Sequence, residues 1–250
     1  MKILVAGDSW TWGWNVDHRW WHNLDNTQDK PERITKNAIY YGDITCVANC
    51  GDSNSVIDQE VHKICRKEHF DLIIVGWTSM LRVHDTRGAI AVHYNEITDE
   101  NREEMEKLYE FFRKTPIDSL QKKMYEHIQS VESIPTKVLH FSIFGDDLGN
   151  VKHKMDISFL EYLANDNGYE FIHSIPTFEF GMLLNHRYEL MKGIFETKAD
   201  IYPTWELAAF ERDKIQLDFP KTDNFQVCGH PSEKGHKLWG KKINNAIRSL

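Results

Sequence analysis

The chain begins with a short apolar run, residues 2–6, that ends abruptly in Gly7-Asp8-Ser9. The run does not alternate between apolar and polar residues, which predicts a strand buried on both faces of a parallel sheet. In open α/β sheets the ligand crevice lies at the carboxyl ends of the strands. We therefore expect Ser9 at such a crevice, with its hydroxyl presented to solvent and main-chain N–H groups close by.

Strand-like and helix-like segments alternate along the rest of the chain. Further strands are predicted at residues 44–48, 71–75, 137–143 and 170–173. Helices are predicted at residues 19–24, 53–67 (capped by Ser53 or Ser55), 103–131 (divided at Pro116), 156–165 and 231–250. This order predicts an α/β protein, a three-layer α/β/α sandwich with a mostly parallel, flavodoxin-like sheet of about five strands. Right-handed crossovers would gather the strand-end loops at one edge of that sheet.

Length and composition indicate one soluble domain. The chain has 250 residues, of which 41% are hydrophobic, and it is expected to form a single domain over 1–250. Insertions are expected at about 83–130 and 175–225, where no strand pattern is found. Pro231 is expected in the first turn of the last helix, where proline is tolerated.

Charge and cysteine usage exclude several classes of partner. The formal net charge of −8 opposes a nucleic-acid-binding surface, which needs a basic face. No apolar run reaches the length of a membrane span, and the chain does not begin with a secretory signal pattern. The four cysteines show neither CxxC pairs nor metal-ligand spacing. We therefore expect reduced thiols and a cytoplasmic protein without a membrane or nucleic-acid partner.

Four loop segments carry the groups that acyl transfer from an ester requires. That chemistry needs a hydroxyl, a base that takes its proton, and donors aimed at the developing oxyanion. Ser9 is the candidate nucleophile and His230 the candidate base. The oxyanion donors would be the N–H groups of Ser9 and Gly51 with the side chain of Thr78. Gly51 suits this role because a residue without Cβ lets its N–H approach a substrate oxygen closely.

In order and spacing, these segments resemble the four motif blocks of the SGNH hydrolase superfamily, also called GDSL-type esterases and lipases. The matching segments are Gly7-Asp8-Ser9, Asn49-Cys50-Gly51, Gly76-Trp77-Thr78 and Val227-Cys228-Gly229-His230. The most specific match is HPSEKGHKLW at residues 230–239. The resemblance covers roughly residues 1–24, 44–82, 136–173 and 226–250. It implies a serine hydrolase that cleaves an ester or O-acetyl group through an acyl-enzyme on Ser9. Carbohydrate acetyl esters are the favoured substrates because the wall beside Ser9 is aromatic and the sequence has no long apolar lid pattern.

Two departures from the family pattern leave a second function open. Thr78 stands where the family usually has the oxyanion-hole asparagine, and Val227 stands where it usually has the aspartate that orients the histidine. A threonine can donate one hydrogen bond, whereas valine cannot hold an imidazole. Asp223 or a main-chain carbonyl is the candidate orienter of His230. The alternative is a catalytically weakened domain that serves as a binding or assembly module.

Aromatic residues crowd beside Ser9, with tryptophan at positions 10, 12, 14, 20 and 21. They form either core and crevice wall or a stacking platform for a sugar or a base. The candidate substrate contacts are Trp10, Trp12, Trp77 and Arg82. Arg82 would either clamp an anionic group or form a surface ion pair.

No metal or cofactor is expected. His18 and His22 are four residues apart, but nothing nearby completes a ligand set. Gly7 is not followed by a phosphate-binding glycine pattern. The expected partner is a small-molecule or glycan ester, and the sequence indicates no oligomeric state.

Overall fold

The computed structural model describes residues 1–13, 16–24, 32–35, 38–49, 51–78, 80, 83–85, 88–90, 117–165 and 231–250. Several expectations concern residues outside this part of the chain. They are the strand at 170–173, the insertion at 175–225, and the site residues Arg82, Asp223 and His230.

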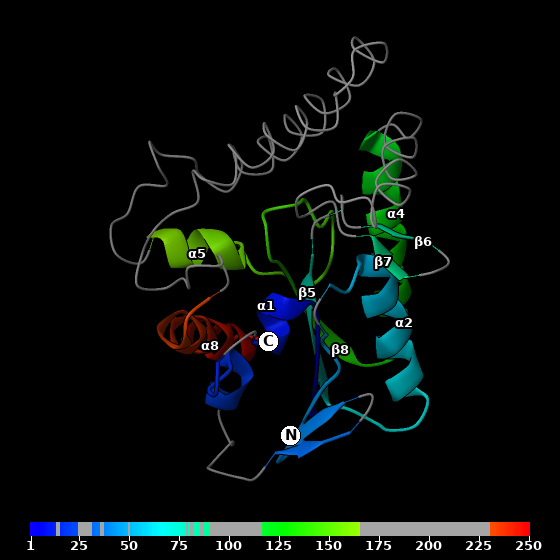
Figure 1. Ribbon diagram of the computed structural model, residues 1–250. Helices are drawn as coiled ribbons and strands as arrows, with labels where there is room; N and C mark the ends of the chain where they lie inside the picture. The colour runs from blue at the N-terminus through cyan, green and yellow to red at the C-terminus, as the bar shows by residue number, and fades with distance from the viewer. Residues whose placement is uncertain are drawn as a thin grey trace, which may run out of the picture.

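A six-stranded sheet in the order β2-β3-β4-β1-β5-β8 forms the centre of the fold (Figure 1). The strands are β1 (Ile3–Ala6), β2 (Arg33–Ile34), β3 (Ile39–Tyr41), β4 (Ile44–Cys46), β5 (Leu72–Trp77) and β8 (Lys137–Ser142). The pairs β1–β4, β1–β5 and β5–β8 are parallel, which confirms a mostly parallel α/β sheet. Every residue of β1 and β5 is buried, as their unbroken apolar sequences predict.

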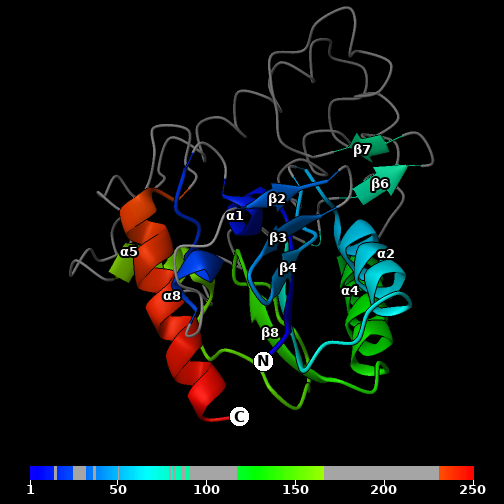
Figure 2. The same cartoon turned by 90° about the horizontal axis from the view of Figure 1, so that it is seen from below.

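Helices cover both faces of the sheet. The helices are α1 (Ser9–Trp12), η1 (Trp20–Asn23, a 3₁₀ helix), α2 (Asn54–Cys65), α4 (Ile117–Glu132), α5 (Phe159–Asn165) and α8 (Glu233–Arg248). Figure 1 and Figure 2 show α2 and α4 together on one side of the sheet, with α5 and α8 on the other. The expected three layers are therefore present.

The sequence prediction missed the antiparallel edge of the sheet. β2 pairs with β3, and β3 pairs with β4 through the Gly42-Asp43 turn, all antiparallel. Residues 15–43 lack a long apolar run, because these strands are only two and three residues long and β2 is exposed. A further hairpin joins β6 (Val83–Asp85) to β7 (Gly88–Ile90), inside the segment expected as an insertion. Residues 117–130 of that same segment belong to α4, which packs against α2.

The ends of the helices refine two expectations. α8 begins at Glu233, and the side chain of Ser232 caps it by accepting a hydrogen bond from Gly235 N. Pro231 therefore precedes the cap and does not lie in the first turn as expected. α4 begins at Ile117, directly after the proline predicted to divide the 103–131 stretch.

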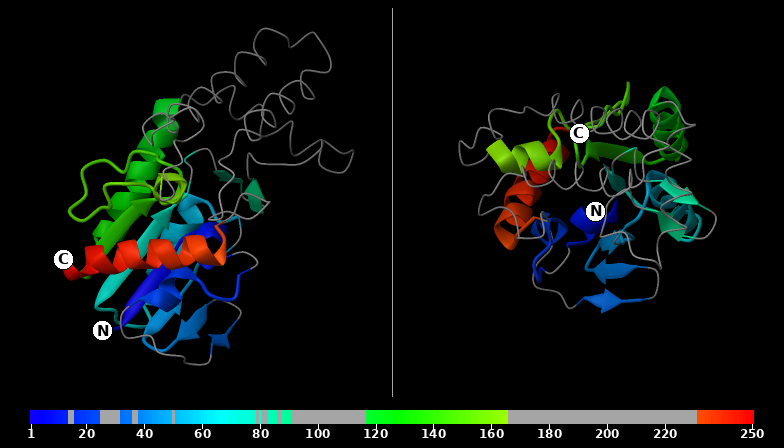
Figure 3. Two further views of the ribbon diagram at one scale, coloured as in Figure 1. Left: turned by 90° about the vertical axis from the view of Figure 1, so that its left-hand side faces the viewer. Right: turned by 45° about the horizontal axis from the view of Figure 1, so that its top comes forward.

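Both termini lie at the same end of the sheet, where the parallel strands begin (Figure 3, left). Because β1, β4, β5 and β8 run parallel, the loops that follow them share the opposite edge. Within the described residues, no helix combines the length and the apolar character that crossing a membrane requires.

Candidate active site

Ser9 opens α1 directly after the central strand β1. Asp8 caps this helix, and its Oδ1 accepts a hydrogen bond from Trp10 N at 2.9 Å. Asp8 is fully buried and Ser9 is only 7% exposed. The expectation that the Ser9 hydroxyl is presented to solvent is therefore corrected, because β1 is an interior strand whose end is surrounded by the neighbouring loops.

Two glycines let α1 pack directly onto the strand ends. A Cβ on Gly7 would lie 2.2 Å from Thr11 Oγ1, and a Cβ on Gly76 would lie 2.7 Å from the same atom. Both distances are shorter than real Cβ contacts. The side chain of Thr11 thus occupies the space that the two glycines leave, and this close approach sets the position of the Ser9 turn.

Thr78 follows β5 and bonds directly to the Ser9 turn. Its Oγ1 donates a hydrogen bond to Asp8 Oδ2 at 2.8 Å, and the residue is fully buried. A threonine hydroxyl has a single proton. In this arrangement the hydroxyl donates that proton in the hydrogen bond to Asp8. It can donate to an oxyanion only if the hydrogen bond to Asp8 breaks.

Asn54, the first residue of α2, fixes the backbone of Thr78. Its Nδ2 donates to Thr78 O at 3.0 Å, and its Oδ1 accepts from Thr78 N at 3.0 Å. The carboxamide thereby satisfies a donor and an acceptor that would otherwise be buried without partners. Asn54 was not among the expected site residues, although it follows the Asn49-Cys50-Gly51 block by only three positions.

Gly51 lies in the loop after β4, on the opposite side of β1 from Thr78. Its φ of 80° is in the left-handed region, which favours glycine. Among the described residues, its N–H takes part in no hydrogen bond. This N–H is therefore available to an incoming acceptor.

Asp52, next to Gly51, is a second buried carboxyl at this edge. Burial raises its pKa from the ordinary 3.8 to about 7, and the nearby Asp8 acts in the same direction. Hydrogen bonds from Asn49 oppose the rise of the pKa. Its Oδ2 has no hydrogen-bond partner in the described part of the chain. Asp52 was not among the expected site residues, because Asp in a Gly-Asp-Ser turn is also typical of a plain loop.

The tryptophans beside the site contribute chiefly to the core. The Trp10 ring packs edge-on against Phe144 and Phe159, with centroids 5.1 and 5.5 Å away. Trp12 is half-buried beneath the guanidinium of Arg19. Among the expected substrate contacts that are described, Trp12 is thus more accessible than Trp10, which is 4% exposed.

Trp77, the last residue of β5, is fully buried. Its Nε1 donates to His140 Nδ1 at 2.9 Å, and His140 Nε2 contacts Glu132 Oε1 at 2.7 Å. Trp77 therefore links β5 to β8 and, through Glu132, to α4. This arrangement gives the ring a structural role in place of the expected substrate contact.

The structure brings three expected site residues to neighbouring strand ends. Ser9, Gly51 and Thr78 follow β1, β4 and β5, which are adjacent in the sheet. Within the described residues, no group of three or more His, Cys, Asp or Glu side chains is arranged to hold a metal ion. Cys46 and Cys65 are free thiols.

No protein-family model matches the sequence, and no curated protein matches it. A search of solved structures finds similarity to the crystal structure of a member of the lipolytic protein G-D-S-L family from Veillonella parvula DSM 2008. The two chains are 14% identical over 100% of each, with a TM-score of 0.43.

Proposed function

We propose that this protein is a serine hydrolase of the SGNH type that cleaves an ester or O-acetyl group. The observation that carries the proposal is the position of Ser9 on the first turn of α1, between the strand ends that bear Gly51 and Thr78. Ser9 Oγ attacks the ester carbonyl while His230 takes its proton. The N–H groups of Ser9 and Gly51 stabilise the oxyanion of the tetrahedral intermediate.

The reaction then proceeds through an acyl-enzyme. The intermediate collapses when His230 returns the proton to the leaving alcohol, and the acyl group stays on Ser9. Water, deprotonated by His230, releases the acid and restores the Ser9 hydroxyl. Asp223 would orient His230, and Arg82 would contact the substrate.

In this proposal Thr78 acts first through Asp8. Its hydroxyl holds the Asp8 carboxylate, which in turn caps the helix that presents Ser9. Thr78 could donate a hydrogen bond to the oxyanion only if its hydrogen bond to Asp8 broke during the reaction. Losing one oxyanion donor typically costs a factor on the order of 10²–10³ in rate, so the two-donor site would be slow for its type.

The alternative function is a binding or assembly module with weakened catalysis. The hydrogen bond that occupies Thr78 and the low exposure of Ser9 favour this alternative. Labelling with a fluorophosphonate, which phosphonylates an activated serine, separates the two. The hydrolase should be labelled on Ser9 in the wild-type protein, and labelling should be lost in Ser9→Ala and strongly slowed in His230→Ala. A wild-type protein that is not labelled, or a Ser9→Ala variant labelled equally well, would overturn the hydrolase.

A further inference from the structure

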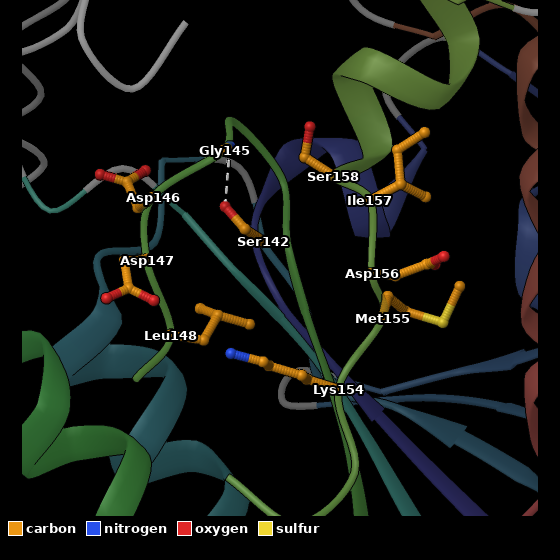
Figure 4. A pocket seen from close by; sticks show the side chains of 10 residues that line it. All are labelled: Ser142, Gly145, Asp146, Asp147, Leu148, Lys154, Met155, Asp156, Ile157 and Ser158. Carbon is orange, nitrogen blue, oxygen red and sulfur yellow. Dashed lines mark hydrogen bonds between the residues drawn. The ribbon is translucent and has the colours of Figure 1, made fainter. Parts of the chain in front are cut away.

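A pocket of about 180 Å³ opens at the carboxyl end of β8, at the same edge of the sheet as Ser9. Its walls are the turn after β8, residues 142–148, and the segment 154–158 that leads into α5. Figure 4 shows the side chains of Leu148 and Lys154 reaching into the space between these two segments. Asp146 points away from that space (Figure 4), and its Oδ1 accepts from Met80 N on the β5 side.

The pocket is a direct neighbour of the candidate active site. Phe144 belongs to one wall segment, and Phe159 follows the other. Both rings pack against Trp10, the residue after Ser9. The turn that carries Ser9 and the two wall segments of the pocket therefore pack on one aromatic cluster.

Two buried serines supply hydrogen-bond donors on the pocket walls. Ser142 Oγ accepts from Gly145 N at 2.8 Å, and Ser158 Oγ accepts from Glu161 N at 3.1 Å. These backbone bonds fix the two oxygens in place. Neither hydroxyl proton has an acceptor among the described residues, although the side chains are 7% and 4% exposed. Each hydroxyl can thus donate to a ligand.

Lys154 and Asp147 add a charged donor and a charged acceptor in fixed positions. Lys154 Nζ donates to Gly149 O at 2.7 Å and keeps further N–H groups for other acceptors. Asp147 is held by Tyr125 Oη at 2.6 Å and by Gly149 N at 2.9 Å. These bonds lower the pKa of Asp147 and keep it ionised.

The lining selects among classes of ligand. Lys154 acts electrostatically on the Asp147 carboxylate, and Lys242 Nζ lies 3.4 Å from Asp156 Oδ1, so the lining has no unbalanced positive charge to attract an anion. An acyl chain would remove these charged groups from water without replacing their hydrogen bonds. A polyhydroxyl compound both donates and accepts, and its C–H faces can contact Leu148 and Met155. The volume equals that of about six water molecules at about 30 Å³ each, which suits one sugar ring.

We propose that this pocket binds a sugar ring of the substrate, so that an O-acyl group on that sugar, or on a neighbouring one, reaches Ser9. The link to Ser9 rests on the proposed hydrolase function, whereas the binding of a sugar in the pocket does not. The two statements can therefore fail separately.

Binding is tested on the Ser9→Ala protein, in which turnover is removed. The probes are methyl glucoside, methyl N-acetylglucosaminide, inorganic phosphate and propan-1-ol, each titrated while amide NMR signals are recorded. A glycoside should shift the signals of residues 142–148 and 154–158 with millimolar affinity, and phosphate and propanol should not. The proposal is overturned if phosphate or propanol shifts these signals and the glycosides do not, or if no probe shifts them.

Variants of the pocket give a second readout. Lys154→Ala removes a donor from an exposed side chain that reaches into the space, and Lys152→Ala, at an exposed lysine two positions before the segment, is the matched control. Lys154→Ala should weaken glycoside binding at least fivefold, and Lys152→Ala should not change it. In hydrolysis, Lys154→Ala should raise the KM above that of the wild-type protein. This rise should be at least fivefold larger for an acetylated methyl glycoside than for p-nitrophenyl acetate. Equal rises for both esters would contradict a sugar subsite, whereas activity that persists in Ser9→Ala would contradict only the proposed hydrolase.

Discussion

Thr78 Oγ1 lies 2.8 Å from Asp8 Oδ2 and donates a hydrogen bond to it. This contact joins the end of β5 to the turn that carries Ser9, across a separation of seventy positions in the sequence. Asp8 is fully buried, so water cannot reach its carboxylate and protein donors must supply its hydrogen bonds. The position of Ser9 therefore depends on Thr78 as well as on the Gly7-Asp8-Ser9 motif itself.

The Thr78→Val variant should be destabilised, because it keeps the shape of the side chain but leaves Asp8 Oδ2 without this donor. The expected loss in the free energy of unfolding is about 1–3 kcal/mol. Fluorophosphonate labelling of Ser9 should also slow, since the helix cap loses its support. Thr78→Ser keeps the hydroxyl and is the control. Urea unfolding and labelling rates check both effects, and a Thr78→Val protein as stable as Thr78→Ser would contradict the role of this bond.

Asn54→Leu should destabilise the protein through the backbone of Thr78. Leucine matches asparagine roughly in size but leaves Thr78 N and Thr78 O without their partners. Each unsatisfied group costs about 1–3 kcal/mol, and urea unfolding should show a loss of at least the lower figure. The control is Gln59→Ala on the exposed face of α2, which should change stability by about 0.5 kcal/mol or less. Equal stabilities of the two variants would show that the Asn54 pairing contributes nothing.

The parallel part of the sheet was predictable because its strands are buried on both faces. The runs at 3–6 and 72–75 are wholly apolar, and 137–142 contains Val138, Leu139 and Phe141, so no helix amphipathicity competes with that pattern. The β3–β4 hairpin was missed, although Ile39-Tyr40-Tyr41 and Ile44-Thr45-Cys46 flank a Gly-Asp turn that is itself a hairpin signal.

The positions of Ser9, Gly51 and Thr78 at one edge of the sheet were predictable, but their bonding was not. Motif order placed the three residues after parallel strands, whose following loops share one edge, and the structure adds that these strands are adjacent. Sequence could not show that the Thr78 hydroxyl bonds to Asp8, or that Trp77 turns inward to His140. Those outcomes depend on where side chains point at the ends of strands. Side chains alternate between the two faces within a strand, and this alternation ends where the strand ends.

Asp52→Asn should stabilise the protein at alkaline pH. Because the folded-state pKa is about 7 against an ordinary 3.8, the folded protein retains a proton that the unfolded chain has lost between these values. Stability therefore falls as the pH rises from about 4 to 7, and the full penalty is present above 7. Its upper limit is about 4 kcal/mol at about 1.4 kcal/mol per pH unit.

Thermal unfolding of Asp52→Asn at pH 4, 6 and 8 measures this penalty. Asparagine cannot ionise, so the advantage of the variant over the wild-type protein should be near zero at pH 4 and largest at pH 8. The exposed Asp43 in the turn before β4 supplies the control, and Asp43→Asn should show no such growth in stability with pH. A constant difference between Asp52→Asn and the wild-type protein at all three pH values would rule out a raised pKa.

The imidazole of His140 should be neutral at pH 7, with its proton on Nε2. Trp77 Nε1 can only donate, so His140 Nδ1 must accept, and the remaining proton on Nε2 then points to Glu132 Oε1. Burial lowers the pKa of His140 and outweighs the opposing effect of Glu132. Imidazole ¹⁵N chemical shifts should show the Nε2–H tautomer and a midpoint below 6.5. Glu132→Gln keeps an acceptor for Nε2 but removes the charge, so the midpoint should move lower still.

Trp77→Phe leaves Nδ1 without its donor, which should cost about 1–3 kcal/mol in stability. An Nδ1–H tautomer in the wild-type protein would contradict the Trp77–His140 bond, and a midpoint that rises in Glu132→Gln would contradict the contact with Glu132.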